Sequence, residues 1–330
     1  MKLENRIIYL VSPEPWGVHY LSKHHYALHL QEKNEVVFIT QGEKWQVSKG
    51  PNDITLLSFK PVKGNRFLPH PLRARSNKKT WLKIANTCGK NPDIIWSFDN
   101  SILPHLDQSN ASFSLAHIVD LNMDYSFATH AESADLAVGT TPYIVQKLKQ
   151  YQSNSRFLHH GCIPRTQNRK NERPTAVYLG KHLIKYLDRP FVISLIKKHP
   201  SVQFRFIGGI EPNNIQGDLS PEDDAFVLNM QSLENVTLVG SIPQNQLNKE
   251  LEKADIYFLA YQQEAHEQVA NPHKVMELLS TGKPVLSFPL EAFKGNRFLK
   301  IFHNSEDYLQ QFNDIVEQSR NSMEPNQPQV

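Results

Sequence analysis

The sequence predicts an α/β protein built from two Rossmann-like, doubly wound domains that face each other across a cleft. At 330 residues the chain exceeds the size at which a single hydrophobic core usually stops growing. Short β-branched runs alternate with segments of helical period, which is the pattern of parallel strands joined by helices. A polar stretch near the middle divides this alternation into two series. With 39% hydrophobic and 21% charged residues, the composition excludes a disordered chain, a collagen-like repeat and a coiled coil.

The first series begins with a β-α-β unit. Residues 7–11 form a β-branched run ended by prolines, which predicts a buried strand. Apolar residues recur at helical spacing over 19–30, and a second β-branched run follows at 36–39, so a helix and a strand are expected there. Further strands are expected at 94–98, 114–119 and 136–138, and further helices at 80–87 and 142–151.

The polar stretch PRTQNRKNERP, residues 164–174, is the expected linker between the domains, because it offers nothing to a core. We therefore expect a first domain over 1–163, a second over 164–320 and a flexible polar tail over 321–330. Strands of the second domain are expected at 176–179, 202–207, 236–239, 256–259 and 285–288. Its helices are expected at 187–198, 224–231, 244–253, 272–281 and 306–319.

The net charge of +3 conceals an uneven distribution. The first 165 residues hold 19 basic and 13 acidic side chains, whereas the remainder hold 17 and 20. Much of the difference lies in residues 54–92, here called the basic segment, which contain no Asp or Glu. Its cations are Lys60, Lys63, Arg66, Arg73, Arg75, Lys78, Lys79, Lys83 and Lys90. One surface of the first domain should therefore be basic. No nucleic-acid partner is expected, since the other half is acidic and no recognisable binding module is present.

Cysteine and histidine usage gives no sign of a metal or a disulfide. Cys88 and Cys162 are far apart and form no C-x-x-C pair. The histidines show no H-E-x-x-H or comparable spacing, so we expect no metal and no required cofactor. No apolar run approaches the ~18 residues that a membrane span needs, and residues 7–11 are too short for a signal peptide. We expect a cytoplasmic protein, at most peripheral on the inner membrane face.

The stretch ANPHKVMELLSTGKPVLSF, residues 270–288, carries the clearest chemistry. Pro272 begins a predicted helix with Asn271 as its expected N-cap, which leaves backbone N–H groups available for an anion. Lys274 and Glu277 are three positions apart and share a face of the first turn. A lysine there can neutralise phosphate, and a carboxylate one turn on can accept the two hydroxyls of a ribose. The alternative is a surface ion pair on an ordinary helix, worth about a few tenths of a kcal/mol.

This stretch resembles the nucleotide-sugar signature of group 1 glycosyltransferases of the GT-B fold, in which a similar segment reads P-x-K-x-x-E-x-x-A-x-G-x-P-V. Further similarities follow in the family's order. They are HG at 160–161, VYLGK at 177–181, FIG at 206–208, NVTLVGSIPQNQL at 235–247 and KADI at 253–256. Asp188 falls where an Asp often opens the next helix. Together the similarities cover roughly residues 156 to 290, about two fifths of the chain.

The resemblance implies that the second domain binds a nucleotide diphosphate sugar and that the first domain binds the acceptor. Lys274 would pair with the donor diphosphate, and Glu277 would hold the ribose hydroxyls. The resemblance implies further donor-site residues around the phosphates: Gly180 for close approach, Gly208, and Lys181 and Lys185 as further cations. It also implies that Ile242 lies near the nucleobase and that Asn271 and His273 lie at the sugar end. For the two glycines the alternative is plain turning of the chain after a strand. The resemblance also implies that the helix at 306–319 returns to the first domain.

The sequence departs from the family at Val269, eight positions before Glu277, where retaining members commonly carry a second acid. The resemblance therefore favours the inverting, membrane-associated members, in which a general base on the first domain activates the acceptor hydroxyl. Asp120 is the preferred base because it follows the strand expected at 114–119, and Asp124 is the second candidate. The alternative is that either carboxylate caps the helix that follows.

In the first domain, different residues are candidates for contact with the acceptor and for contact with a membrane. His24 and His25 lie near the loop after the first strand and would meet the acceptor, although a polar helix face explains both equally well. In the basic segment the cations are interleaved with apolar side chains, which suits a surface that approaches anionic lipid, and the alternative is a solvated basic loop. These apolar residues are Phe67, Leu68, Pro69, Leu72 and Trp81.

The sequence as a whole predicts a glycosyltransferase that moves a sugar from a nucleotide diphosphate sugar to a saccharide acceptor, free or lipid-linked, in cell-surface glycan or polysaccharide synthesis. Two alternatives stay open. One is a sugar-nucleotide epimerase of the same fold, which releases free sugar and nucleotide without an acceptor. The other is a non-catalytic, glycosyltransferase-like binding protein.

Overall fold

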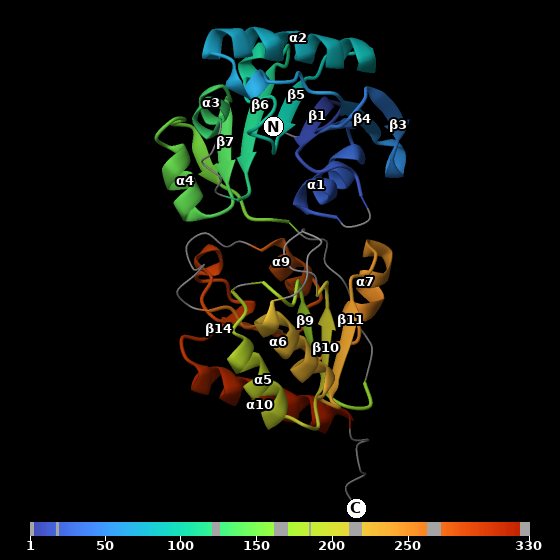
Figure 1. Ribbon diagram of the computed structural model, residues 1–330, viewed down its shortest axis with the longest axis vertical. Helices are drawn as coiled ribbons and strands as arrows, with labels where there is room; N and C mark the ends of the chain where they lie inside the picture. The colour runs from blue at the N-terminus through green and yellow to red at the C-terminus, as the bar shows by residue number, and fades with distance from the viewer. Residues whose placement is uncertain are drawn as a thin grey trace, which may run out of the picture. The chain divides into compact units, whose positions relative to one another are not determined.

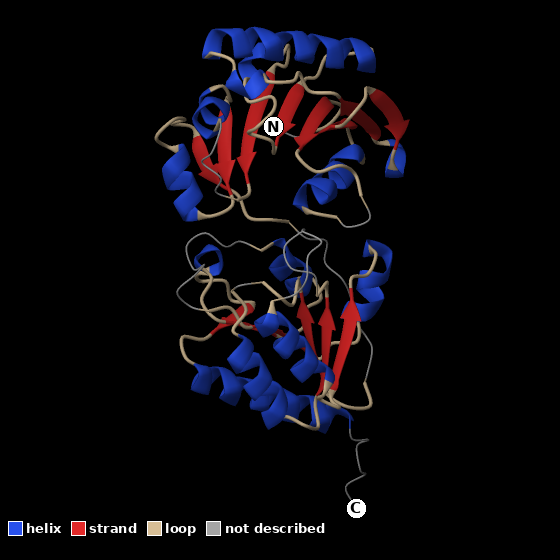
Figure 2. Cartoon of the chain, in the orientation of Figure 1, coloured by secondary structure: helices blue, strands red, loops and turns tan. Residues whose placement is uncertain are grey.

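The computed structural model describes residues 3–17, 20–120, 126–161, 171–184, 186–210, 220–262 and 272–323. Contacts divide the chain into two compact units, Met1–Gly161 and Cys162–Val330. Each unit is a sheet of mainly parallel strands with helices packed against it (Figure 1, Figure 2). Most of the linker expected at 164–174 lies outside the described residues.

The first unit contains an eight-stranded sheet. Its strands are β1 (Ile7–Ser12), β2 (Glu35–Gln41), β3 (Gln46–Lys49), β4 (Thr55–Phe59), β5 (Ile94–Ser97), β6 (Phe113–Ile118), β7 (Leu136–Gly139) and β8 (Ser155–Phe157). Its α-helices are α1 (Ser22–Gln31), α2 (His70–Cys88), α3 (Phe127–Glu132) and α4 (Pro142–Leu148). The strand order is β3-β4-β2-β1-β5-β6-β7-β8, and β3 alone pairs antiparallel among these strands. The carboxyl ends of the parallel strands therefore share one edge.

Both faces of this sheet are buried, which explains why β1 is apolar without alternation. Successive side chains of a strand point to opposite faces. Leu10 packs with Ala27 of α1 on one face, whereas Tyr9 and Val11 pack with Trp81 of α2 on the other. The β-α-β units of the first series therefore wind on both sides of the sheet, as the sequence predicts.

Helix α2 is much longer than the helix expected at 80–87. It runs for 19 residues, beginning after Pro69 and ending at Gly89, which takes the left-handed conformation favoured at a helix C-terminus. The first half of α2 was missed because its exposed lysines and arginines conceal the helical period of its few buried residues. Strand β3 was missed for a related reason, since all of its side chains are exposed and no apolar alternation marks it.

The second unit contains a six-stranded sheet. Its strands are β9 (Thr175–Leu179), β10 (Gln203–Ile207), β11 (Val236–Gly240), β12 (Ile256–Leu259), β13 (Val285–Ser287) and β14 (Leu299–Ile301). Its described helices are α5 (Arg189–Lys198), α6 (Pro221–Gln231), α7 (Gln244–Leu251), α9 (His273–Leu279) and α10 (Ser305–Met323). The order is β11-β10-β9-β12-β13-β14, with every described pair parallel. Because the chain winds outward in both directions from β9, the carboxyl end of β9 is the topological switch point, where such sheets bind ligands.

The final helix belongs to the second unit. Tyr308 and Phe312 of α10 are fully buried in the core of that unit. The side-chain oxygen of Asn313 lies 2.6 Å from Nε2 of His199, at the end of α5. The expectation that this helix returns to the first domain is therefore corrected. Residues 321–323 continue the helix instead of forming a tail, and 324–330 lie outside the described residues.

The predicted fold class is confirmed, since the chain forms two parallel, doubly wound α/β sheets. Within the described residues, none of the helices combines the length and the apolar composition that crossing a membrane requires.

Candidate functional site

The candidate donor site lies at the carboxyl edge of the second sheet, where two glycine turns touch. Gly180 follows β9, and Gly208 follows β10. Their φ angles are 142° and 140°, which favour glycine. The Gly180 N–H donates to Ile207 O at 2.8 Å, and a Cβ added to Gly208 would lie 2.1 Å from Gly180 O. The two turns are thus in backbone contact, so these glycines do more than reverse the chain.

Lys274 reaches the same turn from α9. A Cβ added to Gly180 would lie 2.2 Å from Nζ of Lys274, so the ammonium group sits directly against the Gly180 backbone. Nζ also lies 5.1 Å from the ring centroids of Tyr178 and of Tyr261, within the range of cation–π contacts. The ion pairs described in the second unit are Arg189–Asp223, Arg205–Glu250 and Lys253–Glu250. Lys274 takes part in none of them.

Burial lowers the pKa of Lys274 to about 7, because the surrounding protein removes water from the ammonium group. An anion bound at this place would favour the charged form and would raise that pKa. The site is therefore suited to a negatively charged ligand that approaches the Gly180 backbone.

His182 is a neighbour of Lys274 that the sequence analysis did not single out. Its ring is buried and stands edge-on to Tyr178 and to Phe206, with ring centroids 6.1 and 5.6 Å apart. Burial, and then the charge of Lys274, lower the pKa of His182 to about 4. The imidazole is therefore neutral near pH 7 and adds no second cation. That His182 lies beside Lys274 follows from the three-dimensional packing, and no motif in the sequence indicates it.

Glu277 lies one turn after Lys274, and its side chain is 6% exposed. Such burial excludes the alternative of a solvated ion pair on an ordinary helix. The helix itself starts later than expected. Pro272 is the N-cap because its ψ of 120° is extended, so His273 is the first helical residue and the prediction of Asn271 as N-cap is wrong. Asn271 itself lies outside the described residues.

The remaining donor-side residues lie at the same edge or flank it. Lys181 directly follows Gly180, and Ile242 lies two residues after β11, partly buried against the core. The expected role of Asp188 is confirmed, since its carboxylate accepts a 3.0 Å hydrogen bond from the Phe191 N–H and caps α5. Lys185 and Val269 lie outside the described residues.

The candidate base, Asp120, follows β6 at the carboxyl edge of the first sheet and is exposed. Desolvation by neighbouring protein raises its pKa, with Lys23 opposing that shift and Glu14 adding to it. Helix α3 has Ser126 as its N-cap, so the alternative that Asp120 caps this helix is wrong. Asp124 lies outside the described residues.

Of the two acceptor-side histidines, His24 is buried and both of its ring nitrogens have hydrogen-bond partners within the protein. Its side chain is 1% exposed. Nδ1 accepts a 2.9 Å hydrogen bond from the Leu21 N–H, and Nε2 lies 3.3 Å from Pro15 O, where it donates as the neutral tautomer. No surface of His24 is left for an acceptor. His25 is partly exposed and contacts the Tyr20 ring, with centroids 5.9 Å apart, so it remains the candidate of the pair.

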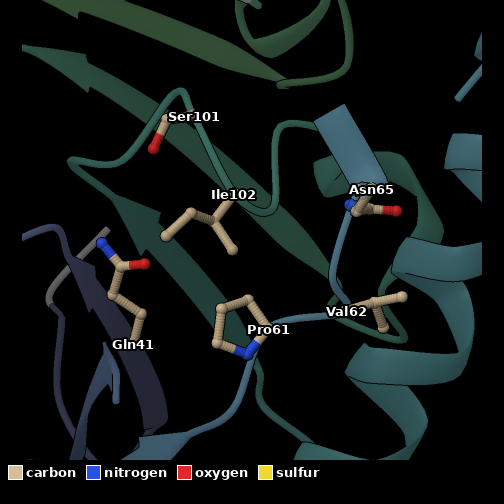
Figure 3. A pocket seen from close by; sticks show the side chains of 7 residues that line it. Gln41, Pro61, Val62, Asn65, Ser101 and Ile102 are labelled. Atoms are coloured by element: carbon tan, nitrogen blue, oxygen red, sulfur yellow. The ribbon is translucent and has the colours of Figure 1, made fainter. Parts of the chain in front are cut away.

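The first unit also holds a pocket of about 360 Å³ at the carboxyl ends of β2, β4 and β5 (Figure 3). Its described lining residues are Gln41, Pro61, Val62, Gly64, Asn65, Ser101 and Ile102. In Figure 3 the side chains of Gln41, Pro61 and Ile102 surround the same space. Sequence reasoning missed this pocket because its residues come from three separate loops that only the strand order brings together.

Comparison with solved structures finds matches over almost the whole chain. Sucrose-phosphate synthase from Thermosynechococcus elongatus is 12% identical and covers 97% of this chain and 94% of its own, with a TM-score of 0.64. The Anabaena protein HepE in complex with UDP and glucose is 13% identical and covers 97% and 92%, with a TM-score of 0.59. The chain has the GT-B fold.

GT-B structures similar to this chain include an epimerase as well as glycosyltransferases. A Listeria monocytogenes protein described as a UDP-N-acetylglucosamine 2-epimerase is 11% identical and covers 97% of this chain and 90% of its own, with a TM-score of 0.55. No protein-family model and no curated protein sequence matches the chain. The GT-B fold therefore has to be combined with the chemistry of the site before a function is proposed.

Proposed function

We propose that this protein is a glycosyltransferase that moves a sugar from a nucleotide diphosphate sugar to a saccharide acceptor. The observation that carries the proposal is the cradle of Gly180, Gly208 and Lys274, in which a desolvated ammonium group lies against a close-packed glycine turn. A diphosphate is the anion that such a cradle suits, because glycine carries no side chain to keep its oxygens from the ammonium group, which pairs with them by charge. The Anabaena protein bound to UDP and glucose supports this choice of ligand.

The donor is held by residues of the second unit. Lys274 pairs with the diphosphate, Lys181 supplies a second cation, and Glu277 accepts the ribose hydroxyls. Ile242 lies beside the nucleobase, and Asn271 and His273 contact the sugar. Loss of the diphosphate leaving group is then assisted by Lys274, whose charge stabilises the negative charge that develops on the leaving oxygen.

The acceptor is activated by the first unit. Asp120 takes the proton of the acceptor hydroxyl while that oxygen attacks the anomeric carbon, and the bond from this carbon to the diphosphate breaks with its electron pair leaving on the diphosphate. This direct displacement inverts the anomeric centre. A raised pKa favours Asp120 as a base, because a more basic carboxylate gives a stronger driving force for proton transfer. Asp124 is the second candidate for this role.

A thermal-shift screen of nucleosides, nucleoside diphosphates and nucleoside diphosphate sugars tests the donor assignment. A ligand present at a hundred times its dissociation constant should stabilise the native state by about 2.7 kcal/mol, which is a rise of several degrees in the unfolding midpoint. We expect one diphosphate series to give that rise and its nucleoside to give none. Equally small rises in the unfolding midpoint with nucleosides and with nucleoside diphosphates would contradict the assignment of the cradle to a diphosphate.

An epimerase is the second candidate, because one similar structure is described as such. The two functions differ in their need for an acceptor. An epimerase would convert the stabilising nucleotide sugar without an acceptor, either to its epimer or, with water as co-substrate, to free sugar and nucleotide. The proposed transferase would hold it intact until a saccharide is added, so product analysis with and without oligosaccharide separates the two.

We also propose that the basic segment approaches an anionic membrane surface, where a lipid-linked acceptor would lie. The exposed cations of this segment are Lys60, Lys63, Arg75, Lys78, Lys79 and Lys83. In the sequence they are interleaved with exposed apolar side chains, of which Phe67 is 76% exposed. On α2, Arg75, Lys79 and Leu82 recur at helical spacing on one exposed face.

Three residues of the basic segment do not belong to this surface. Arg73 turns inward and donates from Nη2 to Ser101 O at 3.0 Å. Lys90 forms an ion pair with Glu35. Trp81 is 4% exposed and donates to a backbone carbonyl, so its expected place among the lipid-facing side chains is wrong.

Sedimentation with phosphatidylcholine vesicles, with and without phosphatidylglycerol, tests the membrane proposal. We expect binding only to the anionic vesicles. The double variant Lys78→Glu, Lys79→Glu should bind at least about 30-fold more weakly, since each lost cation removes about 1 kcal/mol of attraction. The matched control reverses the exposed pair Lys197 and Lys198 on α5 and should bind like the wild type. Binding to neutral vesicles as strong as binding to anionic vesicles would contradict an electrostatic role of the basic segment.

A further inference from the structure

The pocket of Figure 3 is a preformed feature of the first unit. Oδ1 of Asp99, which is buried, accepts hydrogen bonds of 2.7 Å from both the N–H and the hydroxyl of Ser101. Arg73 holds the same residue from the other side through its bond to Ser101 O. On the opposite loop the positive φ of Gly64 allows the turn that presents Asn65. The pocket walls therefore do not depend on a ligand for their shape, as is usual for small-molecule sites.

The chemistry of the walls points to an uncharged saccharide. None of the seven described lining residues is charged or aromatic, which disfavours a phosphate and a nucleobase as ligand. Four of them come from the basic segment, whose exposed Lys60 and Lys63 are not among the described lining residues. The amides of Gln41 and Asn65 each combine a donor with an acceptor, as paired sugar hydroxyls require. The Ser101 hydroxyl donates its hydrogen bond to Oδ1 of Asp99, so its oxygen can accept a hydrogen bond from a ligand. The apolar walls of Pro61, Val62 and Ile102 offer a surface to the C–H face of a sugar ring.

The position of the pocket separates it from the proposed reaction centre. Asp120 follows β6, whereas the pocket is built from loops after β5, β2 and β4. In the strand order these lie one, three and four places from β6. At about 4.8 Å per strand, the middle of the pocket is on the order of 10 Å or more from Asp120, well beyond the ~3 Å reach of a general base. A sugar in the pocket is therefore not the sugar whose hydroxyl reacts.

We infer that this pocket binds a non-reacting sugar unit of the acceptor, and that the acceptor is an uncharged oligosaccharide of at least two units. The inference rests on the proposed glycosyl transfer and adds to it the class of acceptor. Binding energy from the remote unit would then hold the reacting hydroxyl in place, which lowers the barrier to reaction by restricting its motion.

The test is an array of immobilised oligosaccharides, neutral and acidic, from one to six units long, probed with the labelled full chain. We expect retention of neutral oligosaccharides of two or more units and not of the corresponding monosaccharides. Gln41→Ala removes hydrogen bonds to the sugar and should weaken retention about fivefold or more. Ile102→Trp fills the pocket and should weaken it about tenfold or more. Gln46→Ala changes an exposed glutamine of β3 and is the matched control, which should be retained like the wild type.

Several results would overturn the inference. They are retention of monosaccharides as strong as that of longer chains, preference for acidic saccharides, no retention of any uncharged oligosaccharide, and retention that Gln41→Ala and Ile102→Trp leave unchanged. The thermal-shift screen of nucleotide sugars separates this failure from failure of the proposed function. A wild-type chain that is stabilised by a nucleotide sugar but retains no oligosaccharide would refute only the acceptor pocket. A chain that no nucleotide sugar stabilises would refute the donor site on which the proposed function rests.

Discussion

Lys274→Met is expected to lower kcat/KM for the donor by about 10²- to 10³-fold, the usual cost of removing one group that stabilises developing charge. Methionine is unbranched like the lysine stem and suits a place beside the rings of Tyr178 and Tyr261, but it carries no charge. The variant should unfold at the same temperature as the wild type or higher, because it no longer buries an ammonium group without an anion. Loss of function with no loss of stability distinguishes a binding residue from a structural one.

The pH dependence of donor binding checks the same assignment. Only the protonated lysine pairs with a diphosphate, and its pKa is about 7 in the free protein. The affinity for the nucleotide sugar that the thermal-shift screen identifies, whose diphosphate does not titrate in this range, should therefore fall as pH rises from 6 to 9. It should be weak but independent of pH in Lys274→Met, as measured by calorimetry.

The stability of the free protein should change in the opposite sense. The unfolded chain binds a proton at Lys274 up to its ordinary pKa of 10.5, whereas the folded chain releases it near 7. Since the unfolded state binds more protons between these values, Lys274 contributes stability that rises with pH across that window. Lys249→Met, at an exposed position of α7, is the control and should change neither profile. Unchanged affinity for that nucleotide sugar in Lys274→Met would contradict the assignment of Lys274 to the diphosphate.

The cluster of Gly180, Gly208 and Lys274 could be predicted from the sequence because its signals are local and follow regular strands. Gly180 and Gly208 come directly after buried apolar runs, and the carboxyl ends of neighbouring parallel strands share an edge. The spacing of Lys274 and Glu277 places both on one turn of a helix. What the sequence could not give was the backbone contact between the two turns, which depends on the register of β9 against β10.

The first unit was predicted less well because burial there is decided between distant segments. His24 and Trp81 look like surface residues when the neighbouring sequence is polar. In the fold, His24 lies among aromatic rings between α1 and β2, and Trp81 fills the face of the sheet that α2 covers. The pocket of Figure 3 has the same origin, since Gln41 and Ser101 line one space only because β2 and β5 flank β1. The hydrophobic pattern along the sequence identifies helices and strands, whereas the order of the strands in the sheet decides which loops come together to form a site.

Asp120→Asn is expected to leave the affinity for the nucleotide sugar unchanged and to lower the rate of transfer by about 10²- to 10⁴-fold, the range attributed to general base catalysis. Asparagine has nearly the same shape as aspartate but cannot take a proton, so the acceptor and the donor should still bind. The measurement is single-turnover transfer to the oligosaccharide that the array identifies.

The pH profile decides whether Asp120 acts as the base or only positions the acceptor. A base works in its deprotonated form, so wild-type transfer should fall as pH drops through the pKa of Asp120, which desolvation holds above the ordinary value of 3.8. In Asp120→Asn the residual rate should lose this acidic limb, whereas a positioning role would lower the rate and leave the limb in place. Asp107→Asn, at an exposed carboxylate of the same unit, is the control. Undiminished transfer in Asp120→Asn would assign the proton to another group, and Asp124 would then be the residue to replace, because it is the other carboxylate that follows β6.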